Sequence, residues 1–484
     1  MSTCKLIIKD EVNIQLNGLA IETRRKLVNK LKYTLPYARH MPSYKLGRWD
    51  GTKTFFSIGG TGYLGHLDVI LPIVQSDGYE IEVEDNRRPI NLNFKPITET
   101  YWADRGKTWP SGHVHDGKPV TLRDDQADAV NKYLQNPQSM QSISTGAGKT
   151  ITTATLSHLC EPYGRTIIIV PSKNLVVQTE EDYVNLGLDV GVYFGARKEL
   201  NKTHTICTWQ SLNVLDKKKY DDESLSLAEF IDGVVAVIVD EAHSAQADVL
   251  TKLLTQNFNQ CPIRWGLTGT IPKLDYEFQG LLVSLGPVVN TVTAYELQQK
   301  DILASVQVNI MQTTEVLAFK NYQQEYSYLV TDITRLTWLA SLVTKMSLSG
   351  NTLVLVNRID TGNTLLNLIT DSVFISGKVK LDDRQDEYDE IKTSTGKVII
   401  ATYGVAAVGL NIPRIFNLVL VEPGKSFTRV IQSIGRGIRK ANDKDHVEVW
   451  DITSMCSYSK KHLAERKKYY KEAQYPFSIT KVTV

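Results

Sequence analysis

A glycine-rich stretch, QSISTGAGKT (141–150), carries residue types that bind phosphate groups. It follows a short strand-like run and precedes a helical segment that begins near Lys149. Glycines let backbone N–H groups point at anionic oxygens, and the amino end of a helix adds positive potential. Lys149 would reach the outer phosphates of a nucleotide, and Thr150 would offer its hydroxyl to Mg²⁺. Because Ile143 stands where the general pattern has its first glycine, the motif alone also fits an ordinary strand-to-helix turn. The residues expected to bind the nucleotide here are Thr145, Gly146, Ala147, Gly148, Lys149 and Thr150.

Two adjacent carboxylates, Asp240 and Glu241, end an apolar run, VVAVIVD (234–240), further along the chain. Ligands of open α/β sheets bind at the carboxyl ends of the strands, which is where these side chains would lie. Asp240 is expected to hold Mg²⁺ together with Thr150, and Glu241 to orient and deprotonate an attacking water. The tetrapeptide DEAH (240–243) alone also fits an acidic helix cap.

Two arginines stand three residues apart in QSIGRGIRK (432–440). Arg436 and Arg439 would face the same point from one turn of a helix. Phosphoryl transfer spreads negative charge over the phosphate oxygens, and an arginine from a second domain can stabilise that charge. By themselves these arginines would more often solvate a helix or pair with acids, so the other motifs decide the interpretation.

The elements that must position these side chains form two series of buried strands. Short β-branched runs alternate with longer amphipathic stretches, a pattern typical of parallel sheets covered by helices on both faces. The first series comprises 166–170, 203–207, 234–240 and 264–268. The second comprises 352–356, 372–376, 397–401, 417–421 and 446–450. The sequence therefore predicts an α/β protein with two tandem parallel-sheet domains.

A different pattern precedes the first sheet, with strand-like pieces, one helical stretch and turn-rich segments typical of a small α+β module. Residues 286–316 are interpreted as the connection between the two sheets. The expected divisions are an α+β nucleic-acid-binding domain (1–97), a linker (98–118), an ATP-binding domain (119–300), a second sheet domain (301–456) and a basic C-terminal tail (457–484).

Composition restricts the class of protein. The chain has 484 residues and a net charge of +2, so no overall field demands a polyanionic partner and any basic surface must be local. The five cysteines are scattered without a CxxC pair, which fits a reducing cytoplasm. No apolar run is long enough to cross a membrane, and no export signal opens the sequence. We expect a cytoplasmic protein, located in the host cell if phage-encoded, that is not bound to membranes and is monomeric.

Taken together, the motifs resemble those of the superfamily-two helicases and translocases, whose two RecA-like domains clamp ATP between them. The resemblance covers about 120 to 456 and implies a DEAH-type motor that uses ATP and Mg²⁺. It implies a catalytic set of Lys149, Asp240, Glu241, Gln432, Arg436 and Arg439. It implies adenine or ribose contacts from Arg123, Gln126, Gly409 and Asn411, although many members carry an acid at the position of Asn411. It implies nucleic-acid contacts from Pro171, Ser172, Lys173, Thr208, Trp209, Gln210 and Thr402. Coupling of hydrolysis to strand movement would involve His243, Thr268, Gly269 and Thr270.

Shorter identities, including KLGRWDG (45–51), are similar to the phage branch-migration helicases of the UvsW type. That resemblance implies branched DNA substrates such as forks, D-loops and Holliday junctions, with RNA as a further substrate and phage recombination or replication proteins as partners. Two alternatives stay open. One is a translocase that moves on duplex without separating strands in a defence or restriction assembly, and the other is a nucleotide-gated nucleic-acid-binding scaffold.

Two local basic stretches could supply further nucleic-acid contacts. Between Arg24 and Lys53 stand nine basic residues and one acid, Asp50, with tyrosines and a tryptophan interleaved. Such a mixture neutralises phosphates and stacks on bases, so Arg48 and Trp49 are expected contacts. A solvated helix face with core aromatics is the alternative. The lysine-rich stretch after Ser457 fits a duplex contact or a solvated terminal helix equally well.

Overall fold

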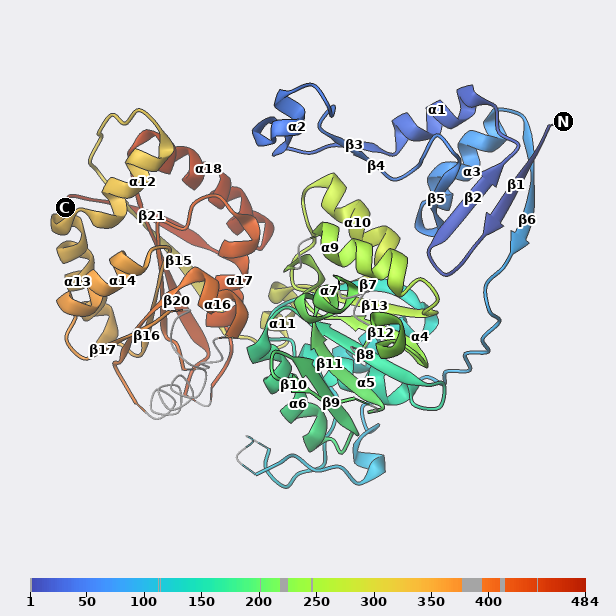
Figure 1. The fold of residues 1–484 in the computed structure, drawn as a ribbon. Coiled ribbons are helices and arrows are strands. Elements are labelled where there is room, and N and C mark those ends of the chain that lie inside the picture. The colour runs from blue at the N-terminus through green and yellow to red at the C-terminus, as the bar shows by residue number, and fades with distance from the viewer. Residues whose placement is uncertain are drawn as a thin grey trace. The chain divides into compact units, whose positions relative to one another are not determined.

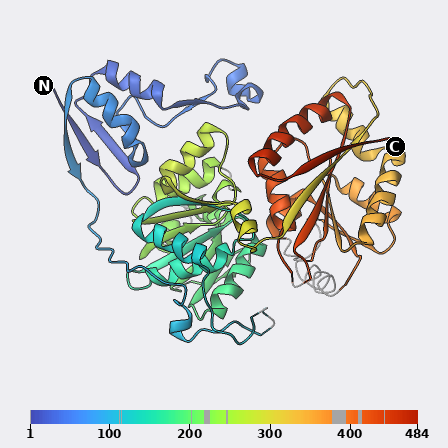
Figure 2. The ribbon, with the colours of Figure 1, turned by 180° about the vertical axis from the view of Figure 1, so that it is seen from behind.

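The computed structural model describes residues 2–111, 113, 115–200, 202–217, 225–244, 247–376, 394–409, 414–441 and 443–484. The chain divides into two compact units (Figures 1 and 2). The first comprises the chain up to residue 142 together with 150–291, and the second comprises 143–149 together with 292–484. No described helix is long and apolar enough to cross a lipid bilayer.

The first unit begins with a small α+β module. Its sheet has the order β5-β2-β1-β6 and is formed by β1 (Ser2–Ile8), β2 (Asn13–Asn17), β5 (Thr61–Tyr63) and β6 (Tyr79–Asp85). β1 pairs antiparallel with β2 and parallel with β6. Helices α1 (Ile21–Lys30) and α3 (Leu67–Ser76), with the short 3-10 turn Leu64–His66, complete the module. Leu16, Leu27 and Ile70 are buried in its core, and the α+β prediction is confirmed.

A narrow extension leaves this module, and we call residues 32–54 the arm. It consists of an antiparallel ribbon, β3 (Lys32–Thr34) and β4 (Thr52–Thr54), with a 3-10 turn (Ala38–His40) and α2 (Pro42–Lys45) between the two strands. In Figure 1 the ribbon leads from α1 to α2, which lies away from the module's sheet.

The segment that joins the module to the first large sheet is packed against that sheet's covering helices. It contains a 3-10 turn (Ala103–Arg105) and a fully buried tryptophan, Trp102. The Trp102 indole donates to Thr155 Oγ1 (2.9 Å), and the Tyr101 hydroxyl lies 2.7 Å from His158 Nδ1. Thr155 and His158 both lie on the helix that follows the glycine-rich loop, so this segment supports that helix.

The first large sheet has the order β10-β9-β11-β8-β12-β13-β7-β14. Its strands are β7 (Gln138–Ile143), β8 (Arg165–Val170), β9 (Val190–Phe194), β10 (Arg197–Lys198), β11 (His204–Thr208), β12 (Val234–Val239), β13 (Ile263–Thr268) and β14 (Val288–Val292). Its helices are α4 (Asp124–Gln135), α5 (Lys149–Cys160), α6 (Lys173–Asn185), α7 (Trp209–Lys217), α8 (Leu227–Phe230), α9 (Ala247–Lys252) and α10 (Asp275–Leu285). Helix α11 (Ala294–Gln299) follows β14 in the chain and belongs to the second unit. A 3-10 turn (Ala242–Ser244) follows β12, and a π-helical turn (Leu253–Asn257) directly follows α9.

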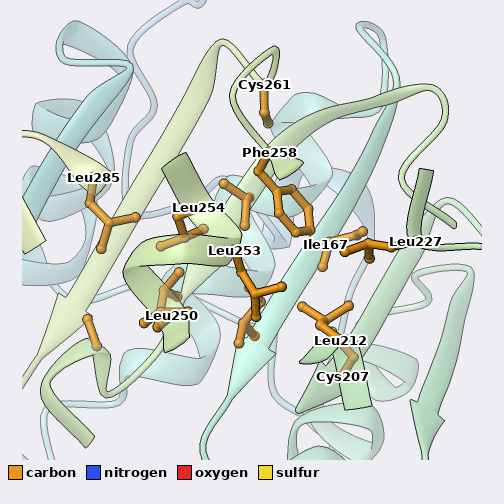
Figure 3. Packing of buried hydrophobic residues seen from close by; sticks show 14 of the residues in the cluster. Ile167, Cys207, Leu212, Leu227, Leu250, Leu253, Leu254, Phe258, Cys261 and Leu285 are labelled. Atoms are coloured by element: carbon orange, nitrogen blue, oxygen red, sulfur yellow. The ribbon is translucent and has the colours of Figure 1, made fainter. Parts of the chain in front are cut away.

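The apolar runs of the sequence form the centre of this sheet because both of its faces are covered. β8 and β12 are parallel neighbours, and Ile167 and Val237 are fully buried. Figure 3 shows Leu250, Leu253 and Phe258 of the α9 region packed against these strands and α7.

The second large sheet has the order β17-β18-β16-β19-β20-β15-β21, and its described pairs are parallel. Its strands are β15 (Ser305–Thr313), β16 (Thr352–Val356), β17 (Ser372–Ile375), β18 (Val398–Thr402), β19 (Asn417–Val421), β20 (His446–Ser454) and β21 (Phe477–Val482). Its helices are α12 (Tyr322–Thr331), α13 (Ile333–Ser347), α14 (Ile359–Leu368), α16 (Tyr403–Gly409), α17 (Phe427–Gly437) and α18 (Ser457–Glu472). The predicted pair of tandem parallel sheets is confirmed.

Two expectations about this region need correction. Residues 286–316, interpreted as a connection, contain β14, α11 and the nine-residue strand β15. The stretch after Ser457 is α18 and β21, and β21 pairs with β15 and extends the sheet. β14 therefore belongs to the first sheet, whereas β15 and β21 are strands of the second sheet and α18 lies in the same unit.

Candidate nucleotide and nucleic-acid sites

The glycine-rich loop joins the end of β7 to the start of α5, as the sequence predicts. Gly146 and Gly148 have φ values of +87° and +72°, a left-handed conformation that glycine adopts without steric cost. The Ser144 N–H donates to Val292 O (3.0 Å) and the Ala147 N–H to Ser144 O (3.3 Å). The loop therefore leads directly into the amino end of a 12-residue helix, the arrangement that binds phosphate groups.

Neighbouring side chains approach two glycines near this loop closely. A Cβ on Gly146 would lie 2.9 Å from Leu303 Cδ2, and a Cβ on Gly435 of α17 would lie 3.0 Å from Thr145 Cβ. All four residues belong to the second unit. The loop and the helix predicted to carry a catalytic arginine thus approach each other through glycine.

The carboxylates lie at the carboxyl end of β12, as predicted. Asp240 follows the strand directly, and its Oδ1 accepts from the Glu241 N–H (2.9 Å). Glu241 has φ +49°, a conformation that is strained for any residue except glycine. Non-glycine residues keep such strain mainly at functional sites, where the surrounding structure holds them.

Glu241 belongs to one hydrogen-bonded network with the predicted coupling residues. His243 Nδ1 lies 2.5 Å from Thr268 Oγ1 and 3.5 Å from Glu241 Oε2. The Gly269 N–H donates to Glu241 Oε2 (3.4 Å), and Thr268 Oγ1 donates to Thr270 O (2.7 Å). Because β12 and β13 are parallel neighbours, their carboxyl ends bring these residues together although they are distant in the sequence.

The residues expected near an adenine have structural contacts at the start of α4. Gln126 is buried, and its Oε1 accepts from the Arg123 N–H (3.0 Å) in a capping box. The Arg123 guanidinium donates to both carboxylate oxygens of Asp125 (2.8 and 2.9 Å). The adenine contact stays a prediction.

The residues of the first sheet that are predicted to contact nucleic acid gather at the ends of β8 and β11. Ser172, Lys173, Thr208 and Gln210 line a cavity of about 250 Å³ together with Ser211 and Val214. The Gln210 amide donates to Pro171 O (3.5 Å), which joins the start of α7 to the segment after β8. Trp209 instead packs against the core cluster of the first sheet. Trp209 therefore has a packing role, and its contact with nucleic acid stays a prediction.

The arm has fewer unpaired charges than its composition suggests. Lys32 pairs with Asp50 (2.6 Å) and Lys53 with Asp248 (2.5 Å). Lys26, which lies on α1 before the arm, pairs with Asp77 (2.7 Å). Hydrogen bonding from Lys32 is the largest of the effects that lower the pKa of Asp50 to about 2. The local field is thus weaker than the count of basic residues implies, although Arg39, Lys45 and Arg48 remain exposed.

Trp49 is also held by structural contacts. Its indole donates to Thr52 O (2.8 Å), and the ring packs beside Leu35 and Ala38. The exposed aromatic groups of the arm are instead Tyr37 (39% exposed) and Tyr44 (43% exposed). Stacking on bases would therefore fall to these tyrosines better than to Trp49.

No pattern in the sequence indicates that the N-terminal module is attached to the first large sheet by partly buried polar contacts. The Glu11 N–H donates to Asn259 O (2.9 Å), and the Asn259 amide donates to Asp10 Oδ2 (2.7 Å). Gln138, the first residue of β7, donates to Glu11 Oε2 (2.8 Å). His66 Nε2 lies 2.6 Å from Gln279 Oε1 on α10. The module and the sheet form one unit for this reason.

In the second unit, Gln432 lies on α17, Arg439 follows that helix, and Thr402 ends β18. Arg436 also lies on α17, and its side chain is outside the described part of the structure. Gly409 is the last residue of α16, and Asn411 lies outside the described residues. The roles predicted for these residues stay predictions.

One basic residue of the C-terminal stretch is not available to nucleic acid. Arg466 and Asp451 are both fully buried, and the guanidinium donates to the two carboxylate oxygens at 2.8 and 2.9 Å. The Tyr470 hydroxyl donates to the same carboxylate (2.8 Å). Arg466 therefore fastens α18 to β20.

Two family models match the chain, and together with the two parallel sheets, the glycine-rich loop and the carboxylate network they place it among the superfamily-two helicases. Residues 119–273 match the family described as "Type III restriction enzyme, res subunit", and 334–441 match "Helicase conserved C-terminal domain". The protein is an ATP-dependent helicase.

Among individual proteins, the chain is similar to the ATP-dependent DNA helicase UvsW of Enterobacteria phage T4. The two are 24% identical over 455 residues, which cover 89% of this chain and 87% of the relative. A putative DNA 3'-5' helicase Rad25 of Haloarcula marismortui is 26% identical over 67% of this chain, and the match spans 51% of that relative. In fold, the chain resembles the DNA-bound Type ISP restriction-modification enzyme LlaBIII, with a TM-score of 0.56, 14% identity, and coverage of 76% of this chain and 32% of that one.

Proposed function

We propose that this helicase remodels branched DNA, such as forks, D-loops and Holliday junctions, during phage recombination and replication. The observation that carries the proposal is the arm, which presents Tyr37 and Tyr44 beside exposed cations and belongs to the same unit as the first motor sheet. Aromatic side chains flanked by cations suit bases exposed where strands separate. The similarity to a phage DNA helicase along most of the chain supports the same assignment.

ATP would bind at the glycine-rich loop. The left-handed glycines and the amino end of α5 suit the phosphates, and Lys149 would pair with the outer ones. Thr150 and Asp240 supply the oxygen ligands that Mg²⁺ prefers, and the ion would neutralise phosphate charge when bound. Glu241 would accept a proton from the attacking water, while Arg436 and Arg439 would stabilise the charge of the transferred phosphoryl group.

The network of Glu241, His243 and Thr268 would link the nucleotide to the strand being moved. A change at Glu241 would reach Gly269 through a hydrogen bond and Thr270 through the polar contacts of His243 and Thr268, all of them 3.5 Å or shorter. The cavity of Ser172, Lys173, Thr208 and Gln210 would hold the nucleic-acid backbone in the same unit.

The test compares unwinding of a fork, a Holliday junction, a tailed DNA duplex and an RNA duplex at one salt concentration. We expect the two branched DNAs to be processed fastest, and equal rates on all four would refute the branched-DNA proposal. Lys149→Ala should abolish ATP turnover and retain basal nucleic-acid binding. Stimulated turnover without strand separation on any substrate would instead support a duplex translocase.

A further inference from the structure

Lys444 lies in a turn beside the carboxyl end of α17. The last carbonyl groups of a helix have no intrahelical donor and need another partner. The Lys444 ammonium donates to Gly437 O, and it donates to Arg439 O at 2.8 Å. Only 3% of this lysine is exposed. Its turn is closed by backbone hydrogen bonds with Ala441 in both directions (3.0 and 3.2 Å).

The backbone beside Arg439 is held from another direction by the segment before β15. Leu303 and Arg439 form an antiparallel bridge, and the Ala304 N–H donates to Ile438 O (2.8 Å). Lys440 pairs with Asp301 in the same segment. The backbone of residues 438–440 is therefore held from two sides, by the bridge to Leu303 and by the buried Lys444 side chain.

Burying a charged ammonium costs free energy, so a lysine at this position needs a compensating interaction. Burial and, to a smaller extent, the Arg439 charge lower the pKa of Lys444 to about 7, while the Asp443 carboxylate acts in the opposite direction. Asp443 is itself bonded to the Arg414 guanidinium (2.6 Å). An apolar side chain would avoid the cost of burial. What the lysine adds is a pair of hydrogen bonds from Nζ to two defined carbonyl groups, Gly437 O and Arg439 O.

We propose that Lys444 is a positioning residue for ATP hydrolysis, which closes the end of α17 and fixes the backbone that carries Arg439. The inference rests on the proposed role of Arg439 at the nucleotide. A catalytic arginine must be held within a fraction of an ångström of its working position, and small displacements far from the reacting atoms cost large factors in rate.

A double-mutant cycle on ATP turnover tests this role. Lys444→Met keeps the side-chain length and removes the donors, so we expect kcat to fall at least about tenfold with little change in KM for ATP. In an Arg439→Ala background, the same substitution should cause no further fall, because the group that it positions is gone. A purely structural role would lower turnover in both backgrounds, and that result would overturn the proposal.

Two further variants make the outcome decisive. Lys345→Met, a matched change of an exposed lysine on α13, should leave kcat unchanged. If Lys444→Met does not fold, the cycle is run with Lys444→Gln, whose amide keeps two N–H donors; we then expect a smaller fall in kcat that again disappears without Arg439. A fall that persists in the Arg439→Ala background refutes the proposal. An Arg439→Ala variant with full turnover would instead refute the proposed nucleotide site.

Discussion

Arg264 offers a measurable test of how the first large sheet holds the elements near the network of Glu241, His243 and Thr268. This residue of β13 is 1% exposed, and its guanidinium donates to three backbone carbonyls: Leu254 O (2.7 Å), Phe258 O (2.5 Å) and Ser284 O (2.7 Å). These carbonyls belong to the π-helical turn, the residue after it and the end of α10. One side chain thus satisfies three buried acceptors from two helical segments.

Two opposing effects set the magnitude for Arg264→Met. Burial lowers the pKa of Arg264 from 12.5 to about 10, a penalty of about 3 kcal/mol that the variant would avoid. Each buried carbonyl left without a donor costs about 1–3 kcal/mol, or roughly 3–9 kcal/mol for three. The lost hydrogen bonds outweigh the relieved burial over most of this range. We expect a net destabilisation of about 2–5 kcal/mol.

Urea unfolding followed by far-UV circular dichroism measures this change, with the midpoint and the m-value fitted separately. Arg197→Met is the control because Arg197 is partly exposed and pairs with Glu180 and Glu199 at the surface (both 2.7 Å). Its loss should cost no more than about 1 kcal/mol. An Arg264→Met protein within about 1 kcal/mol of the wild type would show that the three carbonyls find other partners, and the reasoning would be wrong.

Three further outcomes are expected. Arg466→Met leaves Asp451 buried without its ion-pair partner and should destabilise the second unit by about 3–5 kcal/mol in urea unfolding, with Asp451→Asn in the same chain restoring part of the loss. The pKa of Lys444 is about 7 when folded against 10.5 when unfolded, so the unfolded chain binds more protons between these values and this lysine's contribution to stability rises with pH across that window. Lys444→Met should therefore flatten the rise in unfolding free energy from pH 7 to pH 9, and an unchanged slope would contradict the assignment. Tyr44→Ala should weaken fork binding in a fluorescence anisotropy titration by about 1–3 kcal/mol, and equal affinity would exclude stacking by this tyrosine.

The strands of both large sheets could be predicted because their physical signal is strong. A parallel strand covered on both faces must be apolar along its whole length, as in β8 and β12. β15 escaped prediction because it follows a different pattern, in which buried Val306, Val308 and Ile310 alternate with polar residues. A search for period-two alternation would have found it.

The network of Glu241, His243 and Thr268 could be predicted from the sequence only in part. Motif order placed Glu241, His243 and Thr268 at the carboxyl ends of strands, and the adjacency of β12 and β13 then joins them. The packing role of Trp49 could not be predicted, because an indole between Arg48 and Asp50 fits a base contact as well as a turn. The indole's hydrogen bond to Thr52 O decides its orientation, and no local spacing encodes it.

The attachment of the N-terminal module was beyond sequence reasoning for a related reason. Asp10 and Asn259 are 249 residues apart, and single polar contacts over such separations leave no periodic trace. The contacts nevertheless have a consequence for mechanism. They reach the π-helical turn through Asn13, which donates to Thr255 O (3.0 Å), and α10 through His66.

The π-helical turn and α10 both lie close in the sequence to the network of Glu241, His243 and Thr268. The π-helical turn lies between the DEAH carboxylates and β13, and α10 follows Thr270. An N-terminal module fixed to this segment must follow any movement that hydrolysis causes there, because the partly buried hydrogen bonds connect the two more stiffly than a flexible linker would. Loosening the attachment by Asn259→Ala should therefore reduce fork unwinding more than DNA-independent ATP turnover. Equal losses in both assays would show that the attachment serves stability alone.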